Sequence, residues 1–338
     1  MEKVVVALSG GVDSSYSAKL LKDAGYEVEG VYMKFHPNEA YHEKNIANIK
    51  KVAQYLGIKY HVLDRQEEFS QNVYKPFVEG YIAGLTPNPC AICNRVMKFT
   101  ELIKFADELG VEKVATGHYA KTDGSFIYEG RDKTKDQSYF LFNLKKEFLP
   151  RIIFPLGDRI KEDVKKEAMQ IELLRSIAEQ KESSEICFVE KSYIDVLKKH
   201  TDVDMPGEVV DVKGRVIGEH KGYMHYTIGK RKGFRVYKAH HPHYVIDIIP
   251  QLNRIVVGPK EQLERRTILL RGLNMFEDVK KIECSVKIRY RTHKVPATVT
   301  VDGSVAKVET KEPVVGVAPG QACVFYEGEK VLGGGWIV

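Results

Sequence analysis

The sequence predicts an α/β protein with an N-terminal doubly wound parallel sheet, a small connecting domain and a C-terminal β-barrel. Three observations support this. Strand-length apolar runs alternate with helical patterns in the first half of the chain, and short alternating strands separated by turns fill its end. The 338 residues are also too many for one ordinary core. We expect domains over 1–200, 201–262 and 263–338.

The N-terminal elements follow one another as strand and helix. Residues 4–8 form a short apolar run, and helical spacing of apolar residues follows directly. The expected elements in chain order are a strand over 4–8, a helix over 14–24, a strand over 28–32, a helix over 45–56, a strand over 60–63, a helix over 96–109 and a strand over 113–116. This alternation indicates right-handed crossovers and ligands at the carboxyl ends of the strands.

The pattern changes after about residue 200. A stretch rich in Gly, His and Lys over 201–262 predicts the connecting domain. Residues 281–291 then alternate strictly, with Ile282, Cys284, Val286, Ile288 and Tyr290 on one face, as in a half-buried antiparallel strand. Turn signals follow at Asp302-Gly303, Pro319-Gly320 and Glu327-Gly328. A small closed barrel accommodates these strands.

The loop SGGVDSS (9–15) follows the first strand and opens the first helix. Free backbone N–H groups and the positive end of the helix dipole bind phosphate there, and the two glycines allow close approach. Asp13 can cap the helix or hold a magnesium ion. The simpler alternative is an ordinary strand–helix turn with an N-cap. The loop lacks the Gly-Lys-Ser/Thr ending of a Walker A motif, so γ-phosphate transfer is not indicated.

Composition and charge narrow the class of protein. Apolar content of 43% and charged content of 29% are typical of a globular protein and not of a disordered one. The apolar runs are too short to span a membrane, and the N-terminus lacks a signal-peptide cleavage region, so we expect a cytoplasmic protein without a membrane partner. The net charge is +6, with basic clusters over 221–238 and 287–294 that favour nucleic acid modestly over a solvated surface.

The five cysteines argue against a disulfide framework because their number is odd. Cys284 and Cys323 lie in strand patterns and are expected to be buried and inert. Cys90 and Cys93 lie in TPNPCAICNRVMKF (86–99), where we expect a helix to begin near Arg95 and its dipole to lower the pKa of Cys93. Cys187 lies in KESSEICFV (181–189). Each alone is typical of a core cysteine, and the CxxC also suits a redox pair or half a zinc site.

The motifs resemble known families. SGGVDSS after a strand resembles the PP-loop of ATP pyrophosphatases, which cleave ATP between the α- and β-phosphates. The whole chain resembles the tRNA-specific 2-thiouridylases, the MnmA/TrmU family. The matching segments run nearly end to end: ALSGGVDSS, GVYMKF, TPNPCAICNRVMKF, ATGHYAK, GRDKTKDQSYFLF, KESSEICFV, GEHKGYMHYTIGKRKGF, KIRYR and VAPGQACVFYEGEKVLGGGWI.

The resemblance implies a reaction and its participants. ATP with Mg²⁺ would adenylate O2 of the wobble uridine (U34) in the anticodon stem-loop of tRNA, releasing pyrophosphate. Sulfur from a persulfide carrier or from hydrosulfide would then displace AMP. An adenylated oxygen is a good leaving group and a thiolate-derived sulfur is a strong nucleophile, so the residue types suit this chemistry.

The resemblance also implies site residues. The catalytic residues would be Asp13, Cys90, Cys93 as nucleophile and Cys187 as persulfide carrier. The ATP-binding residues would be Ala7, Leu8, Ser9, Gly10, Gly11, Val12, Asp13, Ser14, Met33 and Gly117. The residues near the target base and tRNA would be Asn88, Pro89, Cys90, Lys135, Asp136, Gln137, Arg289 and Tyr290. His118 matches the adenosine-site motif, although a lone histidine at a strand end is more often structural.

One departure from the family pattern leaves the sulfur route open. Cys90 stands where the family usually has aspartate, so Cys90, Cys93 and Cys187 would meet at one site. Three thiolates suit a [4Fe–4S] cluster whose free iron binds hydrosulfide. The alternatives are a persulfide relay between Cys93 and Cys187 and, less favoured, structural zinc. The segment between Met33 and Asn45 is also shorter than usual in the family.

Two other functions remain compatible with parts of the sequence. A PP-loop ligase with another nucleobase or a small-molecule acceptor would keep the loop but leave the three cysteines and the basic barrel unexplained. A metal-containing tRNA-binding protein without catalytic activity would leave SGGVDSS unexplained.

Overall fold

The N-terminal domain is built on a five-stranded parallel sheet in the order β3-β2-β1-β4-β7. In the computed structural model, which describes residues 1–180 and 186–338, Val4 pairs with Val28 on one side and with Lys113 on the other. The strands are β1 (Lys3–Ala7), β2 (Glu27–Lys34), β3 (Lys59–Asp64), β4 (Lys113–Ala115) and β7 (Ile152–Ile153). The predicted parallel sheet is confirmed.

Helices cover both faces of this sheet because β1 alternates its side chains between them. Val4 and Val6 pack with Leu21 of α1, whereas Val5 packs with Leu102 of α6 on the opposite face. The helices against the first face are α1 (Val12–Asp23) and α2 (Glu39–Leu56), and α8 (Lys161–Gln170) and α9 (Glu172–Ala178) pack on these two helices. The sheet is therefore doubly wound, as predicted.

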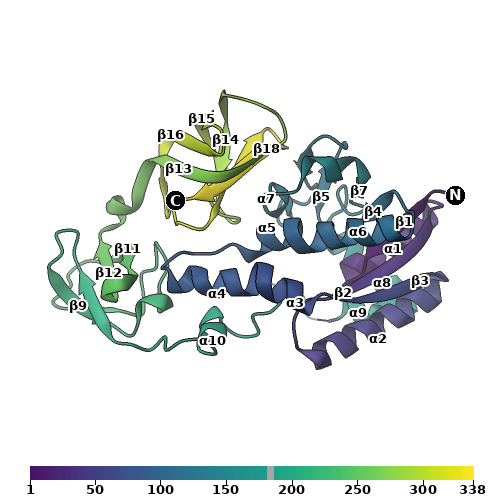
Figure 1. The fold of residues 1–338 in the computed structure, drawn as a ribbon, viewed down its shortest axis with the longest axis horizontal. Helices are drawn as coiled ribbons and strands as arrows, with labels where there is room; N and C mark the ends of the chain where they lie inside the picture. The colour runs from purple at the N-terminus through teal and green to yellow at the C-terminus, as the bar shows by residue number, and fades with distance from the viewer. Residues whose placement is uncertain (181–185) are drawn as a thin grey trace.

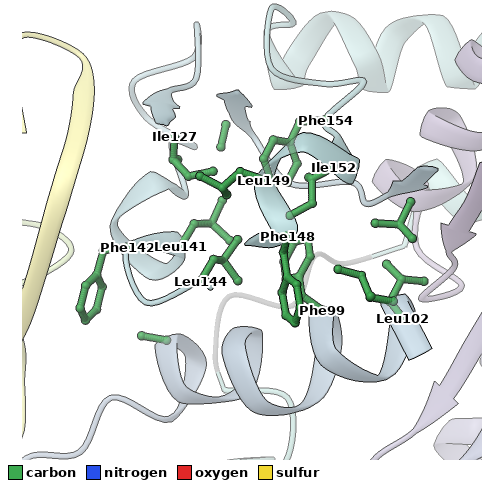
Figure 2. Close-up of a cluster of buried hydrophobic side chains, with 14 of the residues drawn as sticks. Phe99, Leu102, Ile127, Leu141, Phe142, Leu144, Phe148, Leu149, Ile152 and Phe154 are labelled. Atoms are coloured by element: carbon green, nitrogen blue, oxygen red, sulfur yellow. The ribbon is translucent and has the colours of Figure 1, made fainter. Parts of the chain in front are cut away.

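The second face is covered by a long helical segment that carries two cysteines. It consists of α5 (Pro89–Cys93), the π-helical η2 (Asn94–Phe99) and α6 (Thr100–Glu108). Figure 2 shows how Phe99 and Leu102 from this segment meet Phe148, Leu149 and Ile152 from the chain that leads into β7. Leu141, Phe142 and Leu144, in and just after α7 (Ser138–Leu141), close the cluster toward the barrel.

The expected helix start near Arg95 was wrong, because α5 begins at Pro89. Proline at the first helical position loses no hydrogen bond, since its N–H would have no partner there, and its fixed φ suits the helix. Asn88 supplies the N-cap, with its Oδ1 accepting from the Ala91 N–H at 3.4 Å. Cys90 therefore lies in the first turn and Cys93 at the last position of α5.

A second helical segment connects the sheet to the connecting domain (Figure 1). It comprises α3 (Gln66–Phe69), η1 (Ser70–Tyr74) and α4 (Lys75–Ile82). Phe77, Val78 and Tyr81 of α4 pack into the core of the connecting domain, and the Tyr223 hydroxyl donates to the Ile82 carbonyl at 2.6 Å. The connecting domain therefore packs against the N-terminal domain through α4.

The connecting domain holds a five-stranded sheet in the order β10-β9-β8-β12-β11. Its elements are α10 (Tyr193–Leu197), β8 (Gly207–Val210), β9 (Val216–His220), η4 (Tyr223–His225), β10 (Arg235–Val236), β11 (Tyr244–Ile249), η5 (Pro250–Leu252), β12 (Arg254–Gly258) and η6 (Lys260–Leu263). The basic stretch 221–238 runs between and along its strands.

The C-terminal strands form a closed barrel in the order β13-β16-β15-β14-β17-β18, with β13 pairing back to β18. They are β13 (Glu264–Met275), β14 (Lys281–Lys287), β15 (Val295–Asp302), β16 (Val305–Val315), β17 (Ala322–Glu327) and β18 (Lys330–Ile337). The predicted barrel and its turns at Asp302-Gly303 and Glu327-Gly328 are confirmed.

The strand expected over 281–291 is shorter than the alternation suggested. Pairing of β14 ends at Lys287, and the chain then turns, with the Thr292 N–H bonding the Arg289 carbonyl at 3.2 Å. Tyr290 therefore lies in a turn and not on the barrel strand. Of the two cysteines expected to be buried, Cys323 is fully buried in the barrel core and Cys284 is only partly buried.

A hairpin of the N-terminal domain joins the barrel sheet, which the sequence did not predict. β5 (Ala120–Thr122) and β6 (Ile127–Glu129) pair with each other, and Tyr128 of β6 pairs with Lys330 of β18. The remaining short helix is η3 (Lys146–Arg151). Within the described residues, no helix has both the length and the apolar character needed to cross a membrane.

Candidate active site

The loop after β1 is held in place by its own hydroxyl groups and by α2. The Ser9 N–H donates to Ser14 Oγ at 3.0 Å, and Ser14 Oγ donates to the Gly11 carbonyl at 3.1 Å. Asn48 of α2 donates to the Gly10 carbonyl at 3.1 Å. Gly11 is the N-cap of α1 and has no side chain to cap it, so N–H groups of the first helical turn are left for a ligand.

Two glycines bring the backbone close to this loop. Gly10 has φ +80, and a Cβ there would lie 2.8 Å from the Asn45 Cα. A Cβ on Gly117, which follows β4, would lie 3.0 Å from the Asp13 carbonyl carbon and from the Ser14 nitrogen. Only a glycine allows the chain after β4 to pack directly against the first turn of α1. The segments that follow β1 and β4 therefore pack directly against each other and form one surface.

A cavity of about 310 Å³ opens above this surface. Of the predicted ATP-binding residues, it is lined by Ala7, Leu8, Ser9, Asp13, Ser14, Met33 and Gly117. Gly10, Gly11 and Val12 do not line it; Val12 instead packs in the core with Tyr16 and Leu174. Tyr32, Phe35, His36, Tyr41 and His42 add an aromatic wall suited to a nucleobase.

Sequence reasoning missed one cation at the loop. Lys161, the first residue of α8, lies with its Nζ 2.7 Å from both carboxylate oxygens of Asp13, and the Tyr119 hydroxyl donates to the same carboxylate at 2.8 Å. The Lys161 side chain is only 7% exposed. A lysine in the first turn of a helix opposes the helix dipole, and this local conflict is the signal that could have singled it out.

A second, larger cavity of about 1190 Å³ adjoins the first. Cys90, Cys93 and Cys187 all line it, so the three segments predicted to meet do so. The other predicted residues on its wall are Asp13, Asn88, Pro89, Gly117, His118, Lys135, Asp136, Gln137 and Tyr290. Arg289 does not line it; its guanidinium donates to the Ile228 carbonyl at 2.9 Å, where it joins the barrel to the connecting domain.

The three thiols are free and burial disfavours their ionisation. Burial raises the pKa of Cys93 to about 12 and that of Cys187 to about 11, and it also raises the pKa of Cys90. Cys187 has an accessible side chain, yet it lies on the wall of the cavity with protein around it, and desolvation is the main cause of its raised pKa. The expected lowering of the Cys93 pKa was wrong, because Cys93 ends α5 instead of beginning a helix and is 6% exposed.

The three thiols do not make a metal centre as they are placed. Among residues 1–180 and 186–338, no group of three His, Cys, Asp or Glu side chains is arranged so that it could hold a metal ion. The donor types suit iron or zinc, but their arrangement does not.

The barrel holds the segment that leads into Cys90. Gln321, in the turn before β17, donates to the carbonyls of Thr86 at 2.9 Å and Pro87 at 3.3 Å. The Thr86 N–H in turn donates to the Pro319 carbonyl at 2.8 Å. The predicted turn at Pro319-Gly320 thus packs against the start of α5. Two sequence segments separated by more than half the chain therefore determine where Cys90 lies.

His118 and Asp136 are buried and have mainly structural partners. His118 Nδ1 lies 2.8 Å from the Thr116 hydroxyl, and burial lowers its pKa well below the usual value, so the ring is neutral at physiological pH. Asp136 accepts from the Gly130 and Ser138 N–H groups at 3.0 and 3.2 Å. Gln137 Oε1 accepts from the Tyr119 N–H at 2.9 Å. These contacts fix the loop that carries Lys135.

The larger cavity is predominantly basic and has aromatic groups at its rim. Tyr290 stacks near Phe140 with ring centroids 4.6 Å apart, and Lys287 lies over the Tyr290 ring. Eight further cationic or histidine side chains among the described residues line the cavity: Lys98, His118, Lys133, Lys135, Lys161, Arg291, His293 and Lys294. Such a surface suits a single-stranded, unstacked segment of nucleic acid.

Family models match three consecutive parts of the chain. A family model described as tRNA methyl transferase HUP domain matches residues 2–191, a PRC-barrel domain model of the same name matches 194–259, and an aminomethyltransferase β-barrel domain model matches 265–337. Among solved structures, a 4-thiouridine synthetase in complex with RNA and ATP has a TM-score of 0.38 and 18% identity, covering 55% of this chain and 45% of that chain.

Curated relatives match over nearly the whole chain. The tRNA-specific 2-thiouridylase MnmA of a Nitratiruptor species is 77% identical over 100% of this chain and 99% of its own length. That of Sulfurimonas denitrificans is 56% identical over 99% of this chain and 98% of its own length. With the loop, the paired cavities and the three-part architecture described above, these matches show that the chain belongs to the tRNA-specific 2-thiouridylase MnmA family.

Proposed function

We propose that this protein is an ATP-dependent tRNA-uridine 2-sulfurtransferase that thiolates the wobble uridine. One observation carries the proposal. The smaller cavity above the loop after β1, here called the nucleotide cavity, shares a wall with the larger cavity lined by the three cysteines, here called the thiol cavity. Six residues line both of them: Asp13, Lys98, Gly117, His118, Gln137 and Cys187. An enzyme that activates an oxygen with ATP and then replaces it with sulfur needs its nucleotide and its thiols on either side of one reacting atom.

The first step is adenylation of the target uridine. We propose that O2 of the base attacks the α-phosphorus of ATP, the bond to the β-phosphate breaks, and pyrophosphate leaves with the electron pair while the base loses its N3 proton. The loop Ser9–Ser14 would hold the β- and γ-phosphates through backbone N–H groups and the dipole of α1. The adenosine would lie against Met33 and the aromatic wall of the smaller cavity.

A magnesium ion is expected with ATP, and phosphate oxygens and waters supply most of its ligands. Among the described residues, Asp13 is the one carboxylate on the wall of the nucleotide cavity, and both of its oxygens contact Lys161. The residues present therefore do not form a preformed magnesium site, and no step is derived through one.

The second step brings sulfur to C2. We propose that a persulfide on Cys187, loaded by a persulfide carrier, attacks C2 through its outer sulfur, and that the C2–O2 bond breaks as AMP leaves. The Cys93 thiolate then attacks Cys187 Sγ, which releases the thiolated base and leaves a Cys93–Cys187 disulfide. A thiol reductant must reopen that disulfide before the next turnover.

We prefer this relay to a [4Fe–4S] cluster because Cys90, Cys93 and Cys187 line one cavity without forming, among the described residues, a group that could hold a metal. Hydrosulfide delivered by a cluster is the competing route. Anaerobic purification with iron and acid-labile sulfide analysis, on wild type and Cys90→Ala, distinguishes the two. Iron-free protein that thiolates from a persulfide donor supports the relay, and activity that requires bound iron overturns it.

The tRNA would bind as an anticodon stem-loop across the larger cavity. Asn88, Pro89 and Cys90 would border the target base, with Lys135, Gln137 and Tyr290 nearby on the same wall. Residues 1–200 would carry the chemistry, while 201–262 and 263–338 would hold the stem. Because tRNA is its substrate, we place the activity in the cytoplasm.

The decisive experiment incubates the protein with ATP-Mg²⁺, tRNA transcript and a persulfide donor, and measures pyrophosphate and 2-thiouridine. Cys93→Ser is the matched variant, because it should still release pyrophosphate with tRNA present but form no thionucleoside. Pyrophosphate without thiolation by wild type would indicate a PP-loop ligase with another acceptor. If the wild type released no pyrophosphate in the presence of tRNA, the protein would be a tRNA-binding protein without this catalytic activity.

A further inference from the structure

Lys98 lies at the junction of the two cavities. It is the fifth residue of the π-helical η2 (Asn94–Phe99) and lines both the nucleotide cavity and the thiol cavity. A π-helical segment rotates the side chains that follow relative to an α-helix and is frequent at functional sites. This rotation lets one helical segment place Cys93 and Lys98 on the same cavity.

Lys98 has no carboxylate partner in the described part of the chain, whereas neighbouring lysines do. Lys161 pairs with Asp13, Lys133 pairs with Glu129 and Glu329, and Lys294 pairs with Glu129. Lys98 is partly buried between the two cavities. A cation in that position without a counterion is suited to an anionic ligand.

The two cavities define which anion would lie at Lys98. Ser9, Asp13 and Ser14, from the loop proposed to hold the terminal phosphates, line the nucleotide cavity, and Cys187 lies on the shared wall. The group that must stand between the terminal phosphates, the adenosine and the target base is the α-phosphate. We propose that Lys98 binds the α-phosphate of ATP and of the adenylated uridine, and keeps this contact as AMP leaves. This inference rests on the proposed function and deepens it.

The electrostatics of the site agree with that position. The positive charge of Lys98 lowers the pKa values of Cys90, Cys93 and Cys187, against the larger effect of burial that raises them. The same charge adds to burial in lowering the pKa of His118. Lys98 therefore acts on the thiol wall and on the nucleotide side at once.

The contact between Lys98 and the α-phosphate would assist both steps, although Lys98 would form and break no covalent bond. In adenylation, the α-phosphorus exchanges its bond to the β-phosphate oxygen for one to uridine O2, and Lys98 would stabilise the charge on its non-bridging oxygens. When sulfur bonds to C2 and the C2–O2 bond breaks, the electron pair stays on the oxygen of AMP. The same ammonium would stabilise that leaving group. Lys98 would thus be a catalytic residue that contacts the nucleotide throughout.

The test compares AMP with adenosine, because these ligands differ only in the α-phosphate. We would measure both affinities by calorimetry without tRNA, for wild type, Lys98→Gln, Lys98→Arg and the control Lys104→Gln. Lys104 follows in α6 and pairs with Glu101 on the exposed side. Lys98→Gln should lose on the order of tenfold in the preference for AMP while adenosine affinity stays unchanged. Lys98→Arg should recover part of the preference, and Lys104→Gln should match wild type.

Equal losses for AMP and adenosine in Lys98→Gln, or an unchanged preference for AMP, would overturn the inference. Retained adenosine binding shows that the variant is folded. Because these measurements use no tRNA and no sulfur donor, they are separate from the proposed function. Failure of wild type to thiolate would reject that function, whereas a wild type that thiolates beside a Lys98→Gln variant with normal AMP preference would reject only the role of Lys98.

Discussion

The ammonium of Lys161 lies 2.7 Å from both carboxylate oxygens of Asp13, although 148 residues separate the two in the sequence. Asp13 is the second residue of α1, and Lys161 is the first residue of α8. The pair places a positive charge beside the first turn of α1, and it neutralises a carboxylate that would otherwise repel phosphate.

Replacing Lys161 should weaken ATP binding. In Lys161→Met the Asp13 carboxylate loses its ammonium and faces the β- and γ-phosphates unneutralised, so we expect ATP affinity to fall by on the order of tenfold or more. Lys166→Gln, on the same helix and paired with Glu162 in solvent, is the control and should bind ATP normally. Adding Asp13→Asn to Lys161→Met should restore part of the loss. An unchanged ATP dissociation constant in Lys161→Met would contradict this account.

A methyl group on Gly117 should displace the phosphate loop. Its Cβ would stand 3.0 Å from backbone atoms of Asp13 and Ser14, which cannot move without shifting the first turn of α1. Gly117→Ala should therefore lose most tRNA-dependent pyrophosphate release. Gly110→Ala has open space around its Cβ but φ +65, so it should cost about 1 kcal/mol of folding stability and leave ATP binding intact. The same nucleotide affinity in both variants would refute the argument.

The thiols should respond to pH above the usual range for cysteine. Because the pKa of Cys187 is raised to about 11, its alkylation by iodoacetamide should keep accelerating up to about that pH. Cys93, with a pKa of about 12 and little exposure, should react more slowly at every pH. Mass spectrometry of the labelled peptides measures both rates, and a plateau for Cys187 near pH 8 would contradict the prediction.

The raised thiol pKa values also make stability depend on pH. A thiol whose pKa is higher in the folded state than in the unfolded state binds its proton more tightly when the protein is folded. Its contribution to the free energy of unfolding is therefore complete below the pKa of the unfolded state, and it is lost as the pH rises through the pKa of the folded state. For Cys93 the loss falls roughly between pH 9 and 12. The free energy of unfolding of the wild type, measured with denaturant, should fall over this pH window, and that of Cys93→Ala should fall less. Parallel curves for the two proteins would show that Cys93 is not responsible.

Removing the Gln321 side-chain amide should make the segment before α5 more mobile. Gln321→Ala loses the two bonds to the Thr86 and Pro87 carbonyls, which lead directly into Asn88 and Cys90. We expect lower thiolation with nearly normal ATP affinity, because the nucleotide loop is not touched. Gln321→Glu, which cannot donate to these carbonyls, should resemble Gln321→Ala. Faster hydrogen exchange over 86–93 in both variants checks the structural cause.

Local patterns in the sequence were sufficient for the sheet, the barrel and the phosphate loop. Alternation of apolar residues and glycine-containing turns encode these elements within windows of ten to twenty residues, so β1, α1 and the strands after β13 were predictable. The three cysteine segments were also expected to converge, and the cavity that they line agrees with this.

Long-range packing determined what the sequence did not predict. The helix was expected to begin near Arg95, whereas it begins at Pro89, where Asn88 supplies the N-cap and Gln321 of the barrel turn bonds the preceding carbonyls. Arg289 was expected at the tRNA surface but bridges the barrel and the connecting domain through Ile228. Lys161 belongs to no motif considered in advance, and Lys98 lies in TPNPCAICNRVMKF (86–99) but was assigned no role there. Only the fold shows that both lysines line the larger cavity.

The pairing of β6 with β18 has a consequence for how the protein is made. The β5–β6 hairpin of the N-terminal domain pairs with β18, a strand that follows it far along the chain. Ion pairs of Lys133 and Lys121 with Glu329 add to this contact. While the ribosome is still adding β18, β6 has an open edge and the turn at Gln321 cannot yet complete its packing. The join between the β5–β6 hairpin and the barrel is therefore completed only after β18 has been synthesised, whereas all five strands of the parallel sheet are already present once the chain has reached Ile153.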